Sequence, residues 1–138
     1  MESEGYKRLD IYKLAHALAV EVHAMTMTLP KHEMYEEGSQ IRRSSKSVSC
    51  QIVEGFGLRK YKNEFLLYLY RAFASATETV EHLQILRETQ SFRNDVLYAR
   101  LSDGYSELCK KLFRFIQSVE ESHERPFSVR DVQEEYNP

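Results

Sequence analysis

The stretch from Gln40 to Arg59 reads QIRRSSKSVSCQIVEGFGLR, and it decides the fold. Its apolar and small residues recur at intervals of three and four, which places them on one side of a helix. This stripe consists of Ile41, Ser45, Val48, Ile52 and Phe56. Several serines keep the helix thin, so that a neighbouring helix can approach it closely. The stretch therefore predicts a helix that packs tightly on one side.

The same periodicity predicts three further helices. The first ends at Leu29-Pro30, because the residue before a proline is pushed out of the helical region. Gly55 and Gly57 each weaken a helix by roughly 1 kcal/mol, so the second helix ends near them. Asn63 is expected to cap the third helix. Short links between long helices make consecutive helices antiparallel neighbours, which predicts an all-α, up-down-up-down four-helix bundle. The expected helices are 9–29, one beginning between 33 and 39 and ending near 58, 63–89 and 95–121.

The length and composition fit one globular domain with a tail. A chain of 138 residues buries roughly two thirds of its unfolded surface. We expect residues 1–121 to form the bundle domain and residues 122–138 an acidic C-terminal tail. Residues 120–138 hold six acidic residues against two basic ones. Phe127, Val129, Val132 and Tyr136 are apolar, so two interpretations stay open: a solvated tail, or one that docks on a neighbour or shields basic residues.

The two cysteines and the absence of long apolar runs indicate where in the cell the protein is expected. Cys50 and Cys109 lie far apart inside helical patterns, which predicts buried thiols in a reducing compartment, not a disulfide. The first residues are polar and charged, unlike a signal peptide. No apolar run approaches the ~20 residues that span a bilayer. We therefore expect a cytoplasmic protein with no membrane partner.

Positive charge is concentrated between residues 42 and 62. This segment has six basic residues and one acidic residue, a local charge of +5, whereas the whole chain carries −2. Arginine binds phosphate through paired hydrogen bonds, and the interleaved Tyr61 could stack on a base. The segment therefore predicts a nucleic-acid-binding patch, and the alternative is that the arginines pair with carboxylates between helices or subunits. The candidate binding residues are Arg42, Arg43, Lys46, Arg59, Lys60 and Lys62.

No catalytic or metal site is predicted. His16 and His23 lie on the outward side of the first helix, without a carboxylate or cysteine at ligand spacing. Bundle metal sites need a Glu-x-x-His motif on two helices and two further glutamates, which this chain lacks. We expect Glu54 and Glu78 to neutralise arginines between helices instead. The sequence predicts no enzyme, no cofactor and no metal.

Several blocks together resemble a known family, the bacterial four-helix bundle proteins encoded in 23S ribosomal RNA intervening sequences. The resemblance covers about residues 6–120. Its most specific parts are Gln-Ile-Arg-Arg at residues 40–43 and Ile-Val-Glu-Gly at residues 52–55. Leu-Asp-Ile-Tyr at 9–12, Phe-Leu-Leu-Tyr-Leu at 65–69 and Glu78 also match. The chain departs from the family in having Ala74-Ser75 where Gly-Ser is usual.

The resemblance implies a ring-like homopentamer. The related accessory variability proteins of diversity-generating retroelements share the fold, and there the pentamer binds a reverse transcriptase and nucleic acid. Those proteins are strongly basic, whereas this chain is slightly acidic. Assembly has separate support, because the tyrosines and phenylalanines are more numerous than the core of a small bundle needs.

These observations lead to one functional hypothesis and one alternative. We expect a noncatalytic oligomeric bundle that binds RNA, DNA or a ribonucleoprotein partner, such as a reverse transcriptase, through the basic patch. The alternative is a protein-interaction scaffold that binds no nucleic acid and uses its basic residues in salt bridges between subunits.

Overall fold

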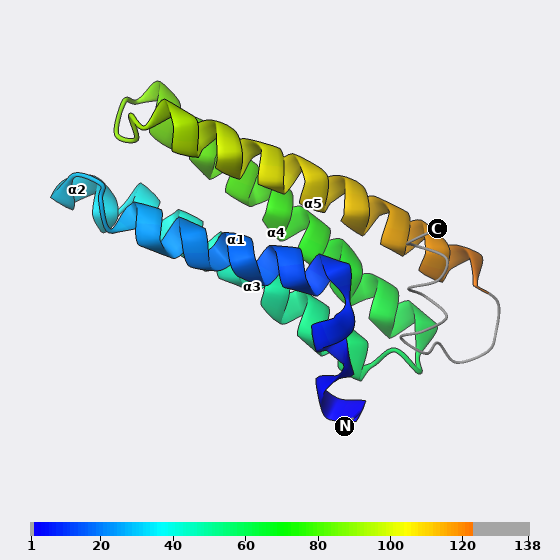
Figure 1. Ribbon diagram of the computed structural model, residues 1–138. Coiled ribbons are helices and arrows are strands. Elements are labelled where there is room, and N and C mark those ends of the chain that lie inside the picture. Colours follow the sequence, from blue (N-terminus) through cyan, green and yellow to red (C-terminus); the bar gives the residue numbers. More distant parts are fainter. Residues whose placement is uncertain (1, 123–138) are drawn as a thin grey trace.

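The computed structural model describes residues 2–122, and all of its regular elements are helices. Four long helices form an antiparallel bundle, which confirms the predicted fold class (Figure 1). Two short elements were not predicted: a 3-10 helix at the N-terminus, and a one-turn helix in the first link. The elements are η1 (Glu2–Arg8), α1 (Asp10–Thr26), α2 (Lys31–Met34), α3 (Glu37–Gly57), α4 (Lys62–Glu88) and α5 (Asp95–Glu121).

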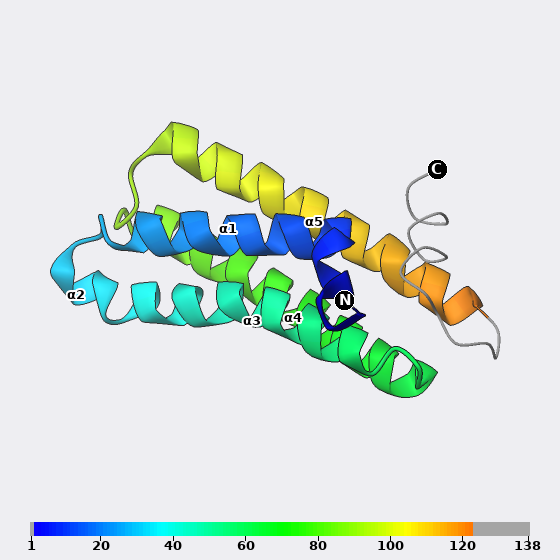
Figure 2. The same cartoon turned by 60° about the horizontal axis from the view of Figure 1, so that its bottom comes forward.

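The four long helices form a closed square in cross-section. In this arrangement α3 packs against α1 and α4, while α5 packs against α4 and α1. The α1/α3 side and the α4/α5 side therefore lie on opposite sides of the bundle. The short helix α2 and the α4–α5 link occupy one end, and η1 crosses the other end beside the α3–α4 link (Figures 1 and 2).

Two predicted boundaries are wrong. The helix α1 ends at Thr26 rather than Leu29, because residues 27–29 continue as single turns in which each N–H reaches back three residues. The helix α4 begins at Lys62 with Tyr61 as its N-cap residue, so Asn63 lies inside the helix and does not cap it. The predicted bounds of α5 match, and Asn94 caps that helix by accepting a hydrogen bond from the Leu97 N–H at 3.0 Å.

The core is built from the predicted apolar stripes. All five members of the α3 stripe are buried, which confirms the periodicity in the deciding stretch. Leu14 of α1 and Leu97 of α5 are only half-buried. Burying one large apolar side chain stabilises a fold by about 1.5–3 kcal/mol, so these stripes hold the four helices together. The largest fully buried side chains include Tyr105, Phe65, Phe115, Ile41, Ile52, Leu69 and Leu101.

The backbones of α3 and α4 approach each other closely at Gly55. A Cβ added at Gly55 would lie 2.9 Å from the Tyr68 Cβ, so only glycine fits there. Gly55 is thus buried inside α3 as a point of close approach. The Thr79 hydroxyl donates to Ser44 at 2.8 Å, and the Ser47 and Ser75 hydroxyls lie 2.9 Å apart. Small side chains therefore allow the two helices to approach, and their hydroxyl groups form hydrogen bonds across the contact.

The segment η1 closes one end of the core. Its Tyr6 ring meets Tyr12 edge-on with centroids 5.0 Å apart, and it meets Phe56 with centroids 6.5 Å apart. Such edge-to-face pairs stabilise by about 0.5–1.5 kcal/mol beyond their buried area. The N-terminal segment thereby covers the end of α3 and the start of α1.

Candidate functional site

Arg42 is used inside the bundle. Its guanidinium donates to the Thr26 hydroxyl at 2.9 Å and to the Met34 carbonyl at 3.0 Å. The side chain is half-buried and joins the end of α1 and the α2 turn to α3. Its partners are a hydroxyl and a carbonyl, whereas the sequence predicted phosphate or carboxylate. Two of its donors are thereby satisfied within the chain.

Arg43 and Lys46 have a different setting. Both are exposed on the outer side of α3, one turn apart. Within residues 2–122, neither makes a hydrogen bond or an ion pair. These two cations remain available to a ligand, although Arg42 beside them does not.

At the other end of α3, the cationic residues are again divided. The Arg59 guanidinium lies over the Phe56 ring at 4.0 Å and donates to the Phe56 carbonyl at 3.0 Å. Lys60 and Tyr61 are exposed in the link that follows. Stacking on Phe56 holds the Arg59 guanidinium against the end of α3. Lys60 is therefore the accessible cation here.

Lys62 caps the last helix. Its ammonium group donates to the carbonyl of Glu120 at 2.9 Å and to the carbonyl of Ser122 at 2.5 Å. The final carbonyls of a helix lack intrahelical partners and carry partial negative charge, so a lysine there is stabilising. Lys62 therefore ties the start of α4 to the end of α5.

The structure thus separates the six predicted binding residues into two groups. Arg42, Arg59 and Lys62 make contacts within the chain, and the cations left exposed are Arg43, Lys46 and Lys60. Lys46 lies eleven residues before the end of α3, which is about 17 Å along the helix axis. The exposed cations therefore form two separate spots along one edge of the bundle.

A groove of about 590 Å³ runs between α1 and α3. Its lining is mainly apolar and contains no carboxylate; the lining residues are His16, Ala19, Val20, His23, Ala24, Lys46, Ser49 and Cys50. Cys50 is exposed in this groove, so the prediction that it is a buried thiol is wrong. The outward position of His16 and His23 is confirmed. The small apolar residues Ala19, Val20 and Ala24 on α1 were the sequence signal for this surface.

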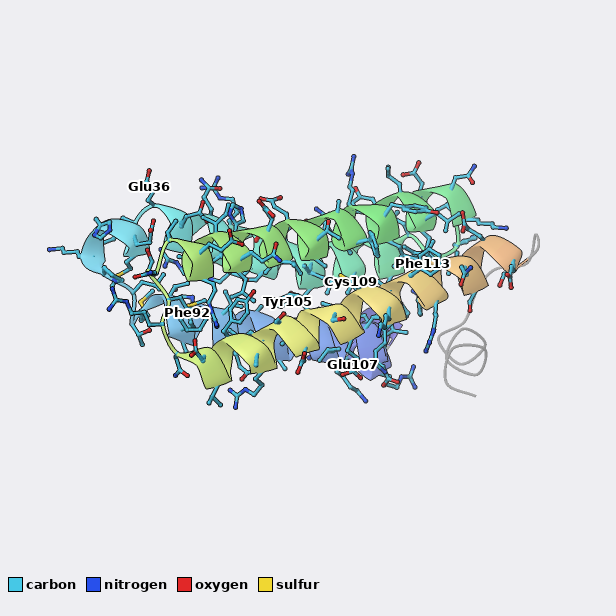
Figure 3. The ribbon with its side chains drawn as sticks, turned by 90° about the horizontal axis from the view of Figure 1, so that it is seen from above. Glu36, Phe92, Tyr105, Glu107, Cys109 and Phe113 are labelled. Carbon is cyan, nitrogen blue, oxygen red and sulfur yellow. The ribbon has the colours of Figure 1, made fainter. Side chains whose placement is uncertain are left out.

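The opposite side of the bundle carries an aromatic surface. Leu67, Tyr70 and Phe113 are 44%, 49% and 54% exposed. The Tyr70 hydroxyl donates to Glu120 at 3.0 Å, which turns that ring towards α5. Figure 3 shows Phe113 on the side of α5 that faces α4, with Glu107 on the other side. We call these three residues the α4/α5 face.

The carboxylates do not form the predicted pairs with arginines. Glu78 contacts His82 at 3.2 Å, and His82 also contacts Glu37 at 2.8 Å, joining α4 to α3. The expectation that Glu78 neutralises an arginine is therefore wrong. In the part of the chain that the structure describes, no three histidine, cysteine or acidic residues are close enough to hold a metal ion. In the same residues, no helix is long and apolar enough to cross a membrane.

The fold defines a class of protein: an all-α four-helix bundle. Residues 7–114 match the family model described as 23S rRNA-intervening sequence protein. Because the match covers most of the chain, the protein belongs to this family. The family description names no reaction. Comparison with curated proteins gives no match.

Proposed function

We propose that this protein is a noncatalytic scaffold that associates with further copies of itself through the α4/α5 face. The observation that supports this most directly is the grouping of Leu67, Tyr70 and Phe113 on one side of the bundle. Exposed aromatic side chains that lie together are typical of subunit contacts. A bundle of this size has no need of them for its own core, which is complete without them.

The form of the assembly follows from symmetry. A ring joins two different surfaces of neighbouring subunits, whereas a twofold dimer joins one surface to itself. We propose the homopentameric ring that the resemblance implies, with the α4/α5 face of one subunit against another surface of the next. The partners of Arg42 and Lys62 lie within the chain, so subunit salt bridges through these two residues are not part of the proposal.

Light scattering coupled to size exclusion tests the assembly. Phe113→Glu places a charge in the centre of the face and should reduce the mass to that of one chain, 16.3 kDa. Val96→Glu is the matched control, because Val96 is an exposed apolar residue of the same helix and is 82% exposed. An assembly that survives Phe113→Glu would reject this face as the contact.

A second function is proposed for the exposed cations. Arg43, Lys46 and Lys60 have no partner among residues 2–122, and Tyr61 beside them is 59% exposed. Repetition around an oligomer would turn weak single contacts into useful avidity. RNA, DNA or a ribonucleoprotein partner, such as a reverse transcriptase, would engage these same residues.

Fluorescence anisotropy with structured RNA and duplex DNA over a salt series tests this second function. Replacing Arg43, Lys46 and Lys60 with alanine should weaken binding and flatten its salt dependence. Each lost contact with duplex phosphate lowers the slope by about 0.9. A matched triple variant, with alanine at Lys13, Lys110 and Arg114, removes the same charge from other exposed sites. Equal losses in both triple variants would reject a local binding site.

A further inference from the structure

The α1/α3 groove has a definite chemical character. We call its small apolar lining residues, Ala19, Val20 and Ala24, the apolar floor; Lys46, His16 and His23 also line it. No acidic residue lines it, although acidic residues outnumber basic ones in the whole chain. The groove therefore favours an occupant that is apolar on one side and acidic on the other. Grooves between helices bind such segments as short amphipathic helices.

The chain contains one segment of this kind outside the described residues. Val129, Val132 and Tyr136 recur at intervals of three and four, the spacing that aligns side chains on one side of a helix. The positions between them hold Asp131, Glu134 and Glu135 together with Arg130 and Gln133, so the segment carries a net charge of −2. Ser128, three residues before Asp131, matches the pattern of a helix start. The sequence of this segment thus complements the groove in both charge and apolar spacing.

The reach of the chain also fits. Lys62 holds the end of α5 at Ser122, beside the link that follows α3. The near end of the groove, Cys50, lies seven residues before the end of α3, about 10 Å along its axis. The six residues between Ser122 and Val129 span up to about 23 Å when extended. From the start of α4, the path to the groove crosses one interhelical spacing of about 8–10 Å to α3 and then follows the axis of α3, and the extended linker is longer than either part.

We propose that residues 128–136 of this chain dock in the α1/α3 groove of their own subunit, with Val129, Val132 and Tyr136 against its apolar floor. The docked segment covers Cys50 and places its carboxylates beside Lys46. It thereby competes with any external ligand for this part of the bundle. This inference does not rest on the proposed self-association, since the α4/α5 face lies on the opposite side.

The reactivity of Cys50 towards dithiobis(nitrobenzoate) reports whether the groove is covered. The measurement uses the full-length chain with Cys109→Ser, so that only Cys50 reacts. Val132→Glu should expose the thiol and raise its reaction rate about tenfold, as expected when a tethered segment at millimolar effective concentration is released. Asn137→Glu is the matched control, because it adds the same charge directly after the docking segment and away from its apolar stripe. Equal rates in the parent and Val132→Glu would overturn the proposal.

A disulfide test then identifies whose groove is occupied. Gln133→Cys, again with Cys109→Ser, places a thiol at the edge of the apolar stripe. Mild oxidation should join it to Cys50 within one chain, which leaves the mass on a non-reducing gel at that of a single chain. A disulfide-linked dimer would overturn docking within the subunit. A failure to form either product, with Cys50 fully reactive, would overturn docking altogether.

Discussion

The two sides of α3 contrast within a single helix. Towards α4, a glycine and several serines let the two backbones approach closely, and the hydroxyl groups at the contact form hydrogen bonds with one another. Towards α1, the same helix leaves a groove lined by Lys46, Ser49 and Cys50. Small side chains thus close one side and leave the other open.

A helix with small side chains can thus pack closely on one side and leave a surface for binding on the other. On the α4 side, the partner helix also has small residues. The two backbones can therefore come close together, and no gap is left between the helices. On the α1 side, Arg42 spans to Thr26 at one end and fixes the spacing of the two helices there. We expect substitutions on the closed side to change stability and substitutions on the open side to change binding.

The largest effect on stability is expected at Gly55. In Gly55→Val, the new side chain would meet the Tyr68 Cβ at less than contact distance, and overpacking of this kind costs about 1–3 kcal/mol. Urea unfolding followed by circular dichroism would measure the loss. Gly57→Ala is the control on the same helix, because nothing lies within 4 Å of its added Cβ. Helix propensity alone would make both variants more stable than the parent. A Gly55→Val variant at least as stable as the parent would therefore contradict close approach.

Arg42 and Arg43 are neighbours with different roles: Arg42 makes hydrogen bonds inside the bundle, whereas Arg43 is exposed. Arg42→Ala removes two hydrogen bonds that join α1, α2 and α3, and losses of about 1–3 kcal/mol are usual when such a group is removed. Arg43→Ala should leave stability within about 0.5 kcal/mol, as for most surface positions. Thermal unfolding of both variants decides this. Equal stabilities would mean that Arg42 holds nothing together.

An effect of opposite sign, about 1 kcal/mol or less at neutral pH, is expected at Tyr105 of α5, whose side chain is fully buried in the core. Its hydroxyl is fully buried without a hydrogen-bond partner. Burial, opposed in part by the nearby Ser45 hydroxyl, raises the pKa of Tyr105 above its ordinary value. Tyr105→Phe removes the unpartnered hydroxyl and should stabilise the fold by about 1 kcal/mol near pH 7.

The stability advantage of Tyr105→Phe grows with pH. Above about pH 10 the unfolded chain loses the tyrosine proton while the native state keeps it, so the free energy of unfolding falls as pH rises. Tyr105→Phe lacks this loss, and its advantage over the parent should increase by up to about 1.4 kcal/mol per pH unit. Urea unfolding at pH 7 and pH 11 gives the comparison. An advantage that is the same at both values would contradict the raised pKa.

Periodicity in the sequence was sufficient for the helices and most of the core. The α3 stripe, the bounds of α5 and the outward histidines were predicted, because each depends on spacing along one helix. The fate of the basic residues could not be predicted in this way. Whether Arg42 reaches Thr26, or Lys62 reaches Ser122, depends on which helices become neighbours and in what register. The prediction that Cys50 is buried was wrong for the same reason, because the exposure of its side chain depends on the groove between α1 and α3.

The contact between Lys62 and the end of α5 also has a practical meaning for protein engineering. Since this lysine holds Ser122, any polypeptide fused beyond the bundle would leave from a fixed origin beside Tyr61. A fluorescent reporter attached there by a short rigid linker would have a defined position relative to the α3–α4 link. In a ring of such subunits, energy transfer between neighbouring reporters would then measure the spacing of the chain ends directly.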